Sequence, residues 1–346
     1  MNGQGAGHPL VSIIIATYRR ADDLDRCLRS VLAEPGDSFE VVVGDDGSPD
    51  HTPDVVASHR HDARVRDYRN ASNLGMQENY RKIARFARGD YLFILTDDDY
   101  LLPGSLAKVK RAVESHPECG YILSHLTTVD ERSGEVVNLH RTYSEDRLIL
   151  PGLPSVAHCA RSAWVLSRQV WKRELIDWEA WDRFKDNIFF PIIVAGRLML
   201  VAPSCYIADN LVVHTWFNKV YWEAFGVNDL EIEFSLAADR YRCMRAILFD
   251  RADDGAARRA IREWEAASFK TYLYLPHLGF YDLARKTGFR PVLRRLVEAQ
   301  PPDRPERWEL LLFPFKIPVV RAWARAKSML RNLPPPIFRR LKALRG

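Results

Sequence analysis

Cysteine is scarce in this sequence, and its spacing excludes two kinds of protein. The chain of 346 residues contains five cysteines, and no two of them form a C-x-x-C pair. A disulfide-stabilised scaffold has more cysteines at closer spacing, and a zinc site built from cysteines uses short repeated spacings. We therefore expect no disulfide framework and no cysteine zinc site, and a reducing compartment is the expected location.

Long apolar runs are also missing. The longest, IFFPIIVAGRLMLVAP at residues 188–203, is interrupted by Pro191, Gly196 and Arg197 and is shorter than a membrane-spanning helix requires. Residues 1–10 contain neither the basic region nor the apolar core of a secretory signal peptide. These absences predict a cytoplasmic protein without a transmembrane helix.

The chain has no glycine-rich phosphate loop in a suitable position. The stretch GQGAG at residues 3–7 precedes the first expected strand, whereas a dinucleotide-binding fingerprint follows that strand and opens a helix. No G-x-x-x-x-G-K-[ST] motif occurs in the sequence. A dinucleotide-dependent enzyme and a P-loop kinase or ATPase are therefore not expected.

Acidic residues are absent from the end of the chain. Nine of the 50 basic residues and none of the 45 acidic residues lie beyond residue 309, so the net charge of +5 comes from this tail. In VVRAWARAKSML, Val319 and Trp323 share one helical stripe, and Arg321 and Arg325 lie opposite. Such a basic amphipathic segment either binds an anionic surface, phospholipid or nucleic acid, or packs its stripe on the protein.

The first 130 residues alternate between two hydrophobic patterns, apolar runs of strand length and segments with the period of a helix. The predicted strands are 10–16, 39–43, 65–68, 91–95 and 121–129, and the predicted helices are 21–32, 77–87 and 103–115. This alternation predicts an α/β protein with a mostly parallel sheet covered by helices on both faces. Ligands of such sheets bind beyond the carboxyl ends of the strands.

Acidic turns follow two of the predicted strands. Asp45 and Asp46 come after the second strand, and Asp97, Asp98 and Asp99 come after the fourth. Adjacent carboxylates repel one another unless water, a cation or hydrogen-bond donors take up the charge. A solvated turn, in which aspartate is common, explains either run by itself. A nucleoside diphosphate that meets these acids requires a divalent cation between the two anions.

Four segments together carry a family resemblance. They are PLVSIIIATYRR at 9–20, FEVVVGDDGSPD at 39–50, NLGMQENYRKIARFARGDYLFILTDDDYLLPGSL at 73–106 and KDNIFFPIIVAGRLMLVAPSCYIADNLVVHTW at 185–216. In this order they resemble glycosyltransferase family 2 on the GT-A fold. The resemblance implies a nucleoside-diphosphate sugar donor, a divalent cation (Mn²⁺ or Mg²⁺) and a transfer that inverts the anomeric centre.

The resemblance also implies roles for single residues of the first half. The residues matched to the donor site are Thr17, Tyr18, Arg19, Asp45, Asp46, Asn73, Gly75, Asn79, Asp97 and Asp98. Tyr18 is expected against the nucleobase, Asp46 is expected to accept a hydrogen bond from it, and Asp97 is expected near the ribose. Asp98 and Asp99 match the metal-binding end, and which of them binds the ion directly stays open. An Asx turn is the alternative for the first acidic pair, and a plain turn is the alternative for the asparagine–glycine loop.

The second half is expected to form the acceptor side. Asp186 in WDRFKDNIFF matches the family's general base, although Lys185 stands where the family has glutamate. By itself, an aspartate at a helix start is usually an N-cap. His214 in VVHTW matches a position that contacts metal or diphosphate in some members, and a core histidine is equally compatible. Trp164 and Trp181, with Lys185, are expected at the acceptor, and a place in the core is the alternative for the tryptophans.

These features predict a chain in three parts. Residues 1–130 are expected to bind the donor, residues 131–230 to hold the acceptor and the base, and residues 231–346 to form a helical extension with the basic tail. The expected activity is a metal-dependent inverting transfer of a hexosyl or deoxyhexosyl group to a cell-envelope glycan or a lipid-linked oligosaccharide precursor. The tail predicts attachment to the anionic inner face of the cell membrane, and no nucleic-acid partner is expected.

Two other functions stay open at this point. One is a non-catalytic module that binds sugar or nucleic acid on a degenerate GT-A fold. The other is a sugar nucleotidyltransferase, which would be expected to have a glycine-rich, basic loop after the first strand. This chain has TYRRADDL there, at residues 17–24, and it keeps both the acidic triplet and an aspartate at the base position.

Overall fold

The computed structural model describes residues 8–130, 133–159, 163, 165–216, 243–251 and 253–274. Contacts divide the chain into two units, residues 1–225 with 242–261 and residues 226–241 with 262–346. The sheet and the candidate site belong to the first unit. Trp164 and the basic tail beyond residue 309 lie outside the described residues. The division at residues 130 and 230 stays a prediction.

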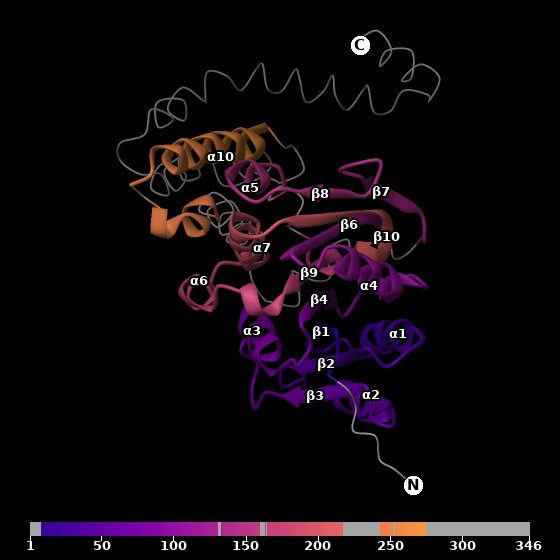
Figure 1. Ribbon diagram of the computed structural model, residues 1–346. Coiled ribbons are helices and arrows are strands. Elements are labelled where there is room, and N and C mark those ends of the chain that lie inside the picture. Colours follow the sequence, from indigo (N-terminus) through magenta and orange to yellow (C-terminus); the bar gives the residue numbers. More distant parts are fainter. Residues whose placement is uncertain are drawn as a thin grey trace. The chain divides into compact units, whose positions relative to one another are not determined.

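Four parallel strands form the first half of the sheet. They are β1 (Val11–Thr17), β2 (Phe39–Asp45), β3 (Val65–Arg69) and β4 (Tyr91–Thr96), in the order β3-β2-β1-β4 (Figure 1). Every residue of β1 and β2 is buried, as expected for strands that are covered on both faces. The first four predicted strands are confirmed.

The second half of the sheet is mixed. Beyond β4 come β9 (Gln169–Lys172), β6 (Tyr121–Asp130), β10 (Ser204–Trp216) and β5 (Tyr100–Leu101), while β7 (Val136–His140) pairs with β6 and β8 (Arg147–Ile149) pairs with β10. β9 is antiparallel to both of its neighbours, whereas β6 and β10 are parallel. The α/β fold class is therefore confirmed. The parallel arrangement holds for β1 to β4 and for β6 with β10, and β9 joins these two groups.

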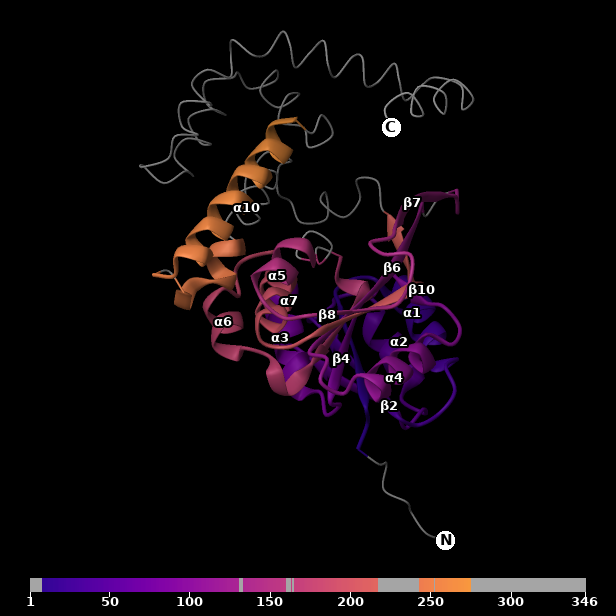
Figure 2. The same ribbon diagram turned by 45° about the horizontal axis from the view of Figure 1, so that its top comes forward.

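Helices cover both faces of this sheet. One face carries α1 (Ala21–Leu32), α2 (Thr52–His59) and α4 (Ser105–Ser115), and the other carries α3 (Met76–Phe86), α6 (Trp178–Arg183) and α7 (Phe190–Val201) (Figure 1 and Figure 2). The remaining helical elements are α5 (Leu153–Cys159), α10 (Gly255–Tyr274), η1 (Leu166–Arg168), η2 (Arg173–Leu175) and η3 (Phe249–Arg251). The three predicted helices correspond to α1, α3 and α4. The sequence pattern missed α2, because eight residues are too short to show a helical period.

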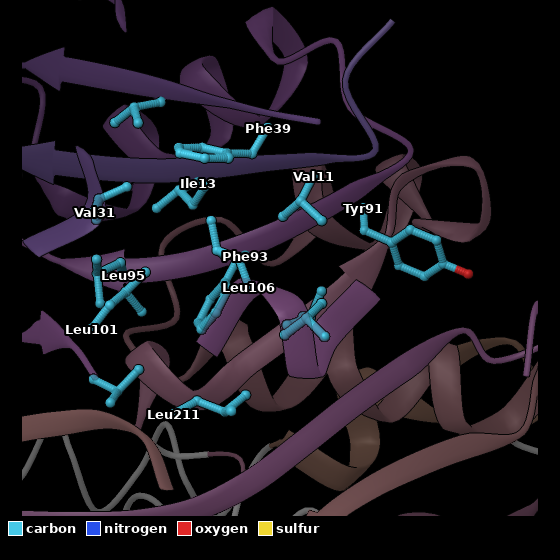
Figure 3. Close-up of a cluster of buried hydrophobic side chains, with 14 of the residues drawn as sticks. Val11, Ile13, Val31, Phe39, Tyr91, Phe93, Leu95, Leu101, Leu106 and Leu211 are labelled. Carbon is cyan, nitrogen blue, oxygen red and sulfur yellow. The ribbon is translucent and has the colours of Figure 1, made fainter. Parts of the chain in front are cut away.

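A large apolar core lies between the sheet and the helices α1 and α4. Figure 3 shows Val11 and Ile13 of β1 and Phe93 of β4 together with Val31 of α1 and Leu106 of α4. Alternate residues of a strand face the same side, so β1 and β4 present one row of apolar side chains to these helices. This packing holds β1 and β4 in place and therefore determines where their carboxyl ends lie.

Two cysteines are paired, contrary to the expectation from their spacing. Cys119 and Cys205 form a disulfide, with their Cα atoms 6.2 Å apart and a separation of 86 positions in the sequence. They become neighbours because Cys119 precedes β6 and Cys205 lies near the start of β10, the parallel partner of β6. A contact made by strand pairing leaves no signal in local spacing. The cysteine argument for a reducing compartment therefore loses its basis.

The apolar run at residues 188–203 forms α7. Among the described residues, no helix has the length and apolar composition that crossing a bilayer requires. α7 has 12 residues and packs against β6 and β9. A Cβ at Gly196 would lie 2.5 Å from Cδ1 of Ile247, so this glycine allows residue 247 to approach the helix closely.

Arg64 holds the end of α1 beside the start of β3. Its Nη1 donates hydrogen bonds to the carbonyls of Glu34 and Gly36, at 2.9 and 3.1 Å. Its Nη2 donates to the carbonyl of Leu32 at 2.9 Å and to Asp62 at 2.7 Å. The guanidinium thus satisfies carbonyls that the end of a helix leaves without intrahelical partners. The hydrogen bond from Arg64 also lowers the pKa of Asp62 to about 2.

Arg64→Met should lower the free energy of unfolding by about 2 kcal/mol near neutral pH, because three carbonyls lose a charged donor. The folded pKa of Asp62, about 2, lies below its ordinary 3.8, so the Asp62 part of this loss is present above pH 3.8 and disappears as the pH falls toward 2. Urea unfolding measures the change. The matched control is Arg60→Met, which removes an exposed pair with Asp67 and should have little effect. Equal effects of the two substitutions would contradict the role of Arg64.

Candidate functional site

The carboxyl ends of β1 to β4 lie side by side at one edge of the sheet. Thr17 is paired in register with Asp45, and Asp45 is paired with Arg69. Thr96 ends β4 beside Ala16 of β1. The acidic turns after β2 and β4 therefore flank the end of β1, as the sequence predicts.

Asp46 fastens the loop after β3 to this edge. Its buried carboxylate accepts hydrogen bonds from the backbone N–H groups of Leu74 and Gly75, at 2.9 and 2.8 Å, and from Nδ2 of Asn70 at 2.8 Å. Its own N–H donates to the carbonyl of Thr17 at 2.9 Å. The carboxylate that was expected to bind a nucleobase is thus already engaged by the protein. In this structure Asp46 acts as a positioning residue for the loop.

Asn79 lies beneath the same loop and is 1% exposed. Its Nδ2 donates to the carbonyl of Gly44 at 2.7 Å, and its Oδ1 accepts from Nδ2 of Asn70 at 3.3 Å. A Cβ at Gly44 would lie 2.6 Å from Oδ1 of Asn79, so only glycine fits at position 44. Asn79 is therefore a buried support of this edge, and the donor contact predicted for it stays a prediction.

Asp45 is also buried. Its Oδ1 accepts a hydrogen bond from the N–H of Ser48 at 2.9 Å, and its Oδ2 lies 3.2 Å from Nε of Arg69. Thr17 is buried at the end of β1. Asp45 and Thr17 therefore form a buried layer, the floor of the candidate site, at this edge of the sheet.

Other residues predicted for the donor site are accessible. Arg19 and Asn73 are exposed, and Tyr18 and Gly75 are half-buried. Gly75 has a φ of 90°, a left-handed value that favours glycine, at the point where the loop enters α3. These four residues offer a surface to a ligand above the buried floor.

Asp97 and Asp98 share one positive partner. Nη1 of Arg20 lies 2.9 Å from Oδ2 of Asp98 and 3.5 Å from Oδ1 of Asp97. Burial raises the pKa of Asp97 to about 7, although the charge of Arg20 acts in the opposite direction. Burial and the neighbouring Asp99 raise the pKa of Asp98 above its ordinary value. Both carboxylates are therefore costly to keep ionised without a cation.

Asp99 is fully buried and satisfied by the protein. Its Oδ1 accepts from the N–H of Thr215 at 2.8 Å, and its Oδ2 accepts from Oγ1 of Thr96 at 2.8 Å. Nδ1 of His214 lies 3.1 Å from both oxygens. Burial lowers the pKa of His214, but the charge of Asp99 outweighs it, so that pKa is raised. The structure therefore joins the predicted residues Asp99 and His214 into one pair.

η1 supports the turn that carries the acidic triplet. Oγ of Ser167 accepts a hydrogen bond from the backbone N–H of Thr96 at 2.9 Å and lies 2.8 Å from Oγ1 of Thr96. Oγ1 of Thr96 in turn reaches Asp99. Ser167 therefore orients the triplet from a segment 71 residues farther along the chain.

Asp186 and Lys185 lie in the turn between α6 and α7, and both are exposed. They line a cleft of about 290 Å³ together with Leu74, Gln77 and Glu78. Leu74 belongs to the loop that Asp46 holds. The predicted base therefore faces the same loop as the predicted donor residues.

Trp181 is a core residue. It is 1% exposed, and its ring stacks on Trp178 at 5.4 Å and on Phe190 at 5.4 Å. A third ring, that of Trp171, meets it edge-on at 5.7 Å. Because protein rings cover both faces of the indole, Trp181 is not available to stack on an acceptor sugar, contrary to its predicted role.

Comparisons with known proteins identify the family. Residues 12–174 match the model of the family described as Glycosyl transferase family 2. Residues 12–174 therefore belong to glycosyltransferase family 2. An uncharacterized glycosyltransferase of Haemophilus influenzae is 32% identical over 113 residues, which are 33% of this chain and 37% of the relative. An uncharacterized protein of Mycobacterium tuberculosis is 28% identical over 270 residues, 74% of this chain and 81% of the relative.

Solved structures confirm the GT-A fold. A crystal structure of S. aureus TarS has a TM-score of 0.61 with 17% sequence identity, and the match covers 92% of this chain and 87% of that one. A mannosyltransferase from Pyrobaculum calidifontis has a TM-score of 0.52 with 17% identity and covers 92% of this chain and 84% of its own. The chain therefore has the GT-A fold, and the acidic turns after β2 and β4 lie at the carboxyl edge of its sheet.

Three residues of this glycosyltransferase site were missed in the sequence. Arg20 is the second arginine of ATYRR. Only its contacts with the acidic triplet in the folded chain distinguish it from the neighbouring residues. Ser167 and Thr215 come from η1 and β10 and act on the triplet through hydrogen bonds. Serine and threonine are common in every kind of local structure, so the sequence carries no signal for these two contacts.

Asp46→Asn should release the loop after β3, because an amide nitrogen cannot accept the hydrogen bonds that a carboxylate oxygen accepts. The loss should raise amide hydrogen exchange at Leu74 and Gly75 about tenfold, which corresponds to ~1.4 kcal/mol. The control is Asn73→Ala, which removes a single acceptor for the N–H of Gly75 and should raise exchange less. Unchanged exchange in Asp46→Asn would show that the loop is held by other contacts.

Proposed function

We propose that this glycosyltransferase moves a sugar from a nucleoside-diphosphate donor to a hydroxyl of a cell-envelope glycan or a lipid-linked oligosaccharide precursor, with inversion and with a divalent cation. The observation that carries the proposal is the pair of the buried Asp97 and the half-buried Asp98 at the end of β4, at the same edge of the sheet as the loop that Asp46 holds. Two similar folds support the donor class. TarS was solved with UDP-GlcNAc, and the Pyrobaculum calidifontis mannosyltransferase was solved with GDP-Man and Mn²⁺.

The carboxylates of this chain suit a divalent cation whose remaining ligands are the oxygens of a diphosphate. Among the described residues, no three His, Cys, Asp or Glu side chains form a group that could hold a metal ion by themselves. Mg²⁺ and similar ions are commonly held by one or two carboxylates and completed by substrate phosphate oxygens. When bound, such an ion stabilises the charge that develops on the leaving diphosphate.

Asp98 is the better placed of the two candidate ligands. Its side chain is 13% exposed, whereas that of Asp99 is 0% exposed. Asp99 already accepts hydrogen bonds from Thr96 and Thr215 and pairs with His214. In our proposal Asp98 holds the ion directly, and Asp99 positions His214 and the turn.

Asp186 is proposed as the general base. A direct displacement at the anomeric carbon needs one group that takes the proton of the acceptor hydroxyl on the face opposite the leaving diphosphate. Asp186 is an exposed carboxylate in a cleft that also includes Leu74 of the donor-side loop. Lys185 lies beside it in the same cleft and is proposed to bind the acceptor. A double displacement would require a separate nucleophile, for which the sequence offers no second candidate.

Asp98→Asn and Asp99→Asn should fail in different ways. Asp98→Asn should keep the melting temperature of the unliganded protein and lose the additional stabilisation that Mn²⁺ and a nucleoside diphosphate give together, which is about 2.7 kcal/mol at a hundred times the dissociation constant. Asp99→Asn should lower the stability of the unliganded protein by about 2 kcal/mol, because buried donors lose their acceptor. A thermal-shift screen of UDP, GDP and dTDP with and without Mn²⁺ measures both. A normal Mn²⁺-dependent shift in Asp98→Asn would remove this residue from the ion's ligands.

Asp186→Asn should lower the rate by about a hundred- to ten-thousandfold and leave donor binding near normal, because the amide keeps the shape but cannot take a proton. The control is Asp182→Asn, which loses an exposed carboxylate of the adjacent helix α6 and should keep a near-normal rate. The anomeric coupling constant of the product, measured by NMR, should show the inverted configuration. A retained configuration would refute direct displacement, and a near-normal rate in Asp186→Asn would place the base elsewhere.

The proposal includes the subcellular location of the protein. We propose a cytoplasmic enzyme that the basic segment beyond residue 309 attaches to the anionic inner face of the cell membrane. This rests on the charge pattern of the tail alone, since nine basic and no acidic residues lie there. Each basic residue near an anionic bilayer contributes about 1 kcal/mol to binding.

A further inference from the structure

Arg20 lies where the chain leaves β1, and an unusual backbone turn places it there. Arg19 has a φ of 58°, the single positive value of a non-glycine residue in the part of the chain that the structure describes. Its N–H donates to Oγ of Ser48 at 3.0 Å, which anchors this turn to the segment after β2. Arg19 is exposed, while the next side chain, Arg20, turns toward the acidic triplet. Backbone values of this kind are concentrated at functional sites.

The guanidinium of Arg20 bridges three carboxylates. Nη1 lies 2.9 Å from Asp98 and 3.5 Å from Asp97, and Nε lies 3.3 Å from Asp23 of α1. The Arg20 side chain is 18% exposed, so solvent screens these pairs only in part. Among the contacts of the described residues, Arg20 supplies the positive charge nearest to the carboxylate of Asp98.

We propose that Arg20 is an internal counter-cation that keeps a divalent ion from binding at Asp98 until the nucleoside diphosphate is present. The proposal rests on the proposed function, because it concerns the same ion. Without nucleotide, an ion at Asp98 would lie close to a fixed positive guanidinium, and the two cations repel each other. The diphosphate brings negative charge that offsets both cations, so ion and nucleotide bind together. Arg20 is therefore a positioning residue that couples the two binding events.

The chain provides a matched control in Arg26. Its Nη2 lies 3.1 Å from Asp23 and donates to the backbone carbonyl of Asp98 at 2.8 Å, but it does not reach the carboxylate of that residue. Arg20→Gln and Arg26→Gln therefore remove the same charge from the same cluster. Only the first removes a cation from the carboxylate that is proposed to bind the ion.

Electron paramagnetic resonance of free Mn²⁺, titrated with protein in the absence and presence of UDP, GDP or dTDP, tests this role. The wild-type protein should bind Mn²⁺ weakly alone and at least about tenfold more tightly with the preferred nucleotide. Arg20→Gln should bind Mn²⁺ alone about tenfold more tightly than wild type, so the effect of the nucleotide shrinks. This factor is smaller than two bare charges would give at an effective dielectric near 20, because Asp97 and Asp23 offset part of the Arg20 charge and solvent screens it in part. Arg26→Gln should change the affinity for Mn²⁺ alone less than threefold, because its guanidinium is farther from the carboxylate.

The outcomes separate this inference from the proposed function. If the wild-type protein shows coupling and Arg20→Gln shows the same Mn²⁺ affinity and the same coupling, the role of Arg20 is refuted while the metal proposal stands. If Arg20→Gln binds Mn²⁺ normally but loses nucleotide affinity, Arg20 is a diphosphate ligand and the inference is also refuted. If no nucleotide changes Mn²⁺ binding in the wild type, both proposals fail. Arg20→Lys keeps the charge and should resemble wild type, which serves as the test if Arg20→Gln does not fold.

Discussion

Charge at the carboxyl end of β4 is the constraint on which the rest of the site depends. Three adjacent aspartates follow this strand, and the protein compensates them in two different ways. Asp99 receives neutral donors and a histidine from β10 and β4, so it is part of the framework. Asp97 and Asp98 share the guanidinium of Arg20 as their ion-pair partner, and burial still raises the pKa of both carboxylates, so they favour additional positive charge.

The sheet supplies the geometry that makes this charge useful. The parallel register of β2, β1 and β4 brings the turns after β2 and β4 to one edge, on either side of the end of β1. Asp46 then uses its carboxylate to hold the loop after β3, and Leu74 of that loop borders the cleft that contains Asp186. One group of acids therefore shapes this edge of the sheet, and our proposal assigns the charge of the other group to binding a ligand and accepting a proton.

The correct and incorrect predictions have a common physical origin. Apart from α2 and the two-residue strand β5, the strands and helices of the first 115 residues follow from hydrophobic period, because a buried strand or a helix face is a local property of the sequence. The Cys119–Cys205 pair and the antiparallel strand β9 depend on which segments become neighbours in the sheet. Trp181 shows the same limit, because an aromatic residue suits a sugar face and a core equally well, and only its contacts with Trp178 and Phe190 decide between them.

The sequence by itself determined the fold class, the family resemblance and the edge of the sheet at which the acidic turns meet. Turns that follow parallel strands come together at the carboxyl ends of those strands. The sequence did not determine which acids are available to a ligand. Asp46 and Asn79 match donor-site positions and Asp99 matches a metal-binding position in the sequence, but the folded chain uses their side chains for its own hydrogen bonds. Only the tertiary structure decided this, because burial and hydrogen-bond partners come from segments up to 116 residues away.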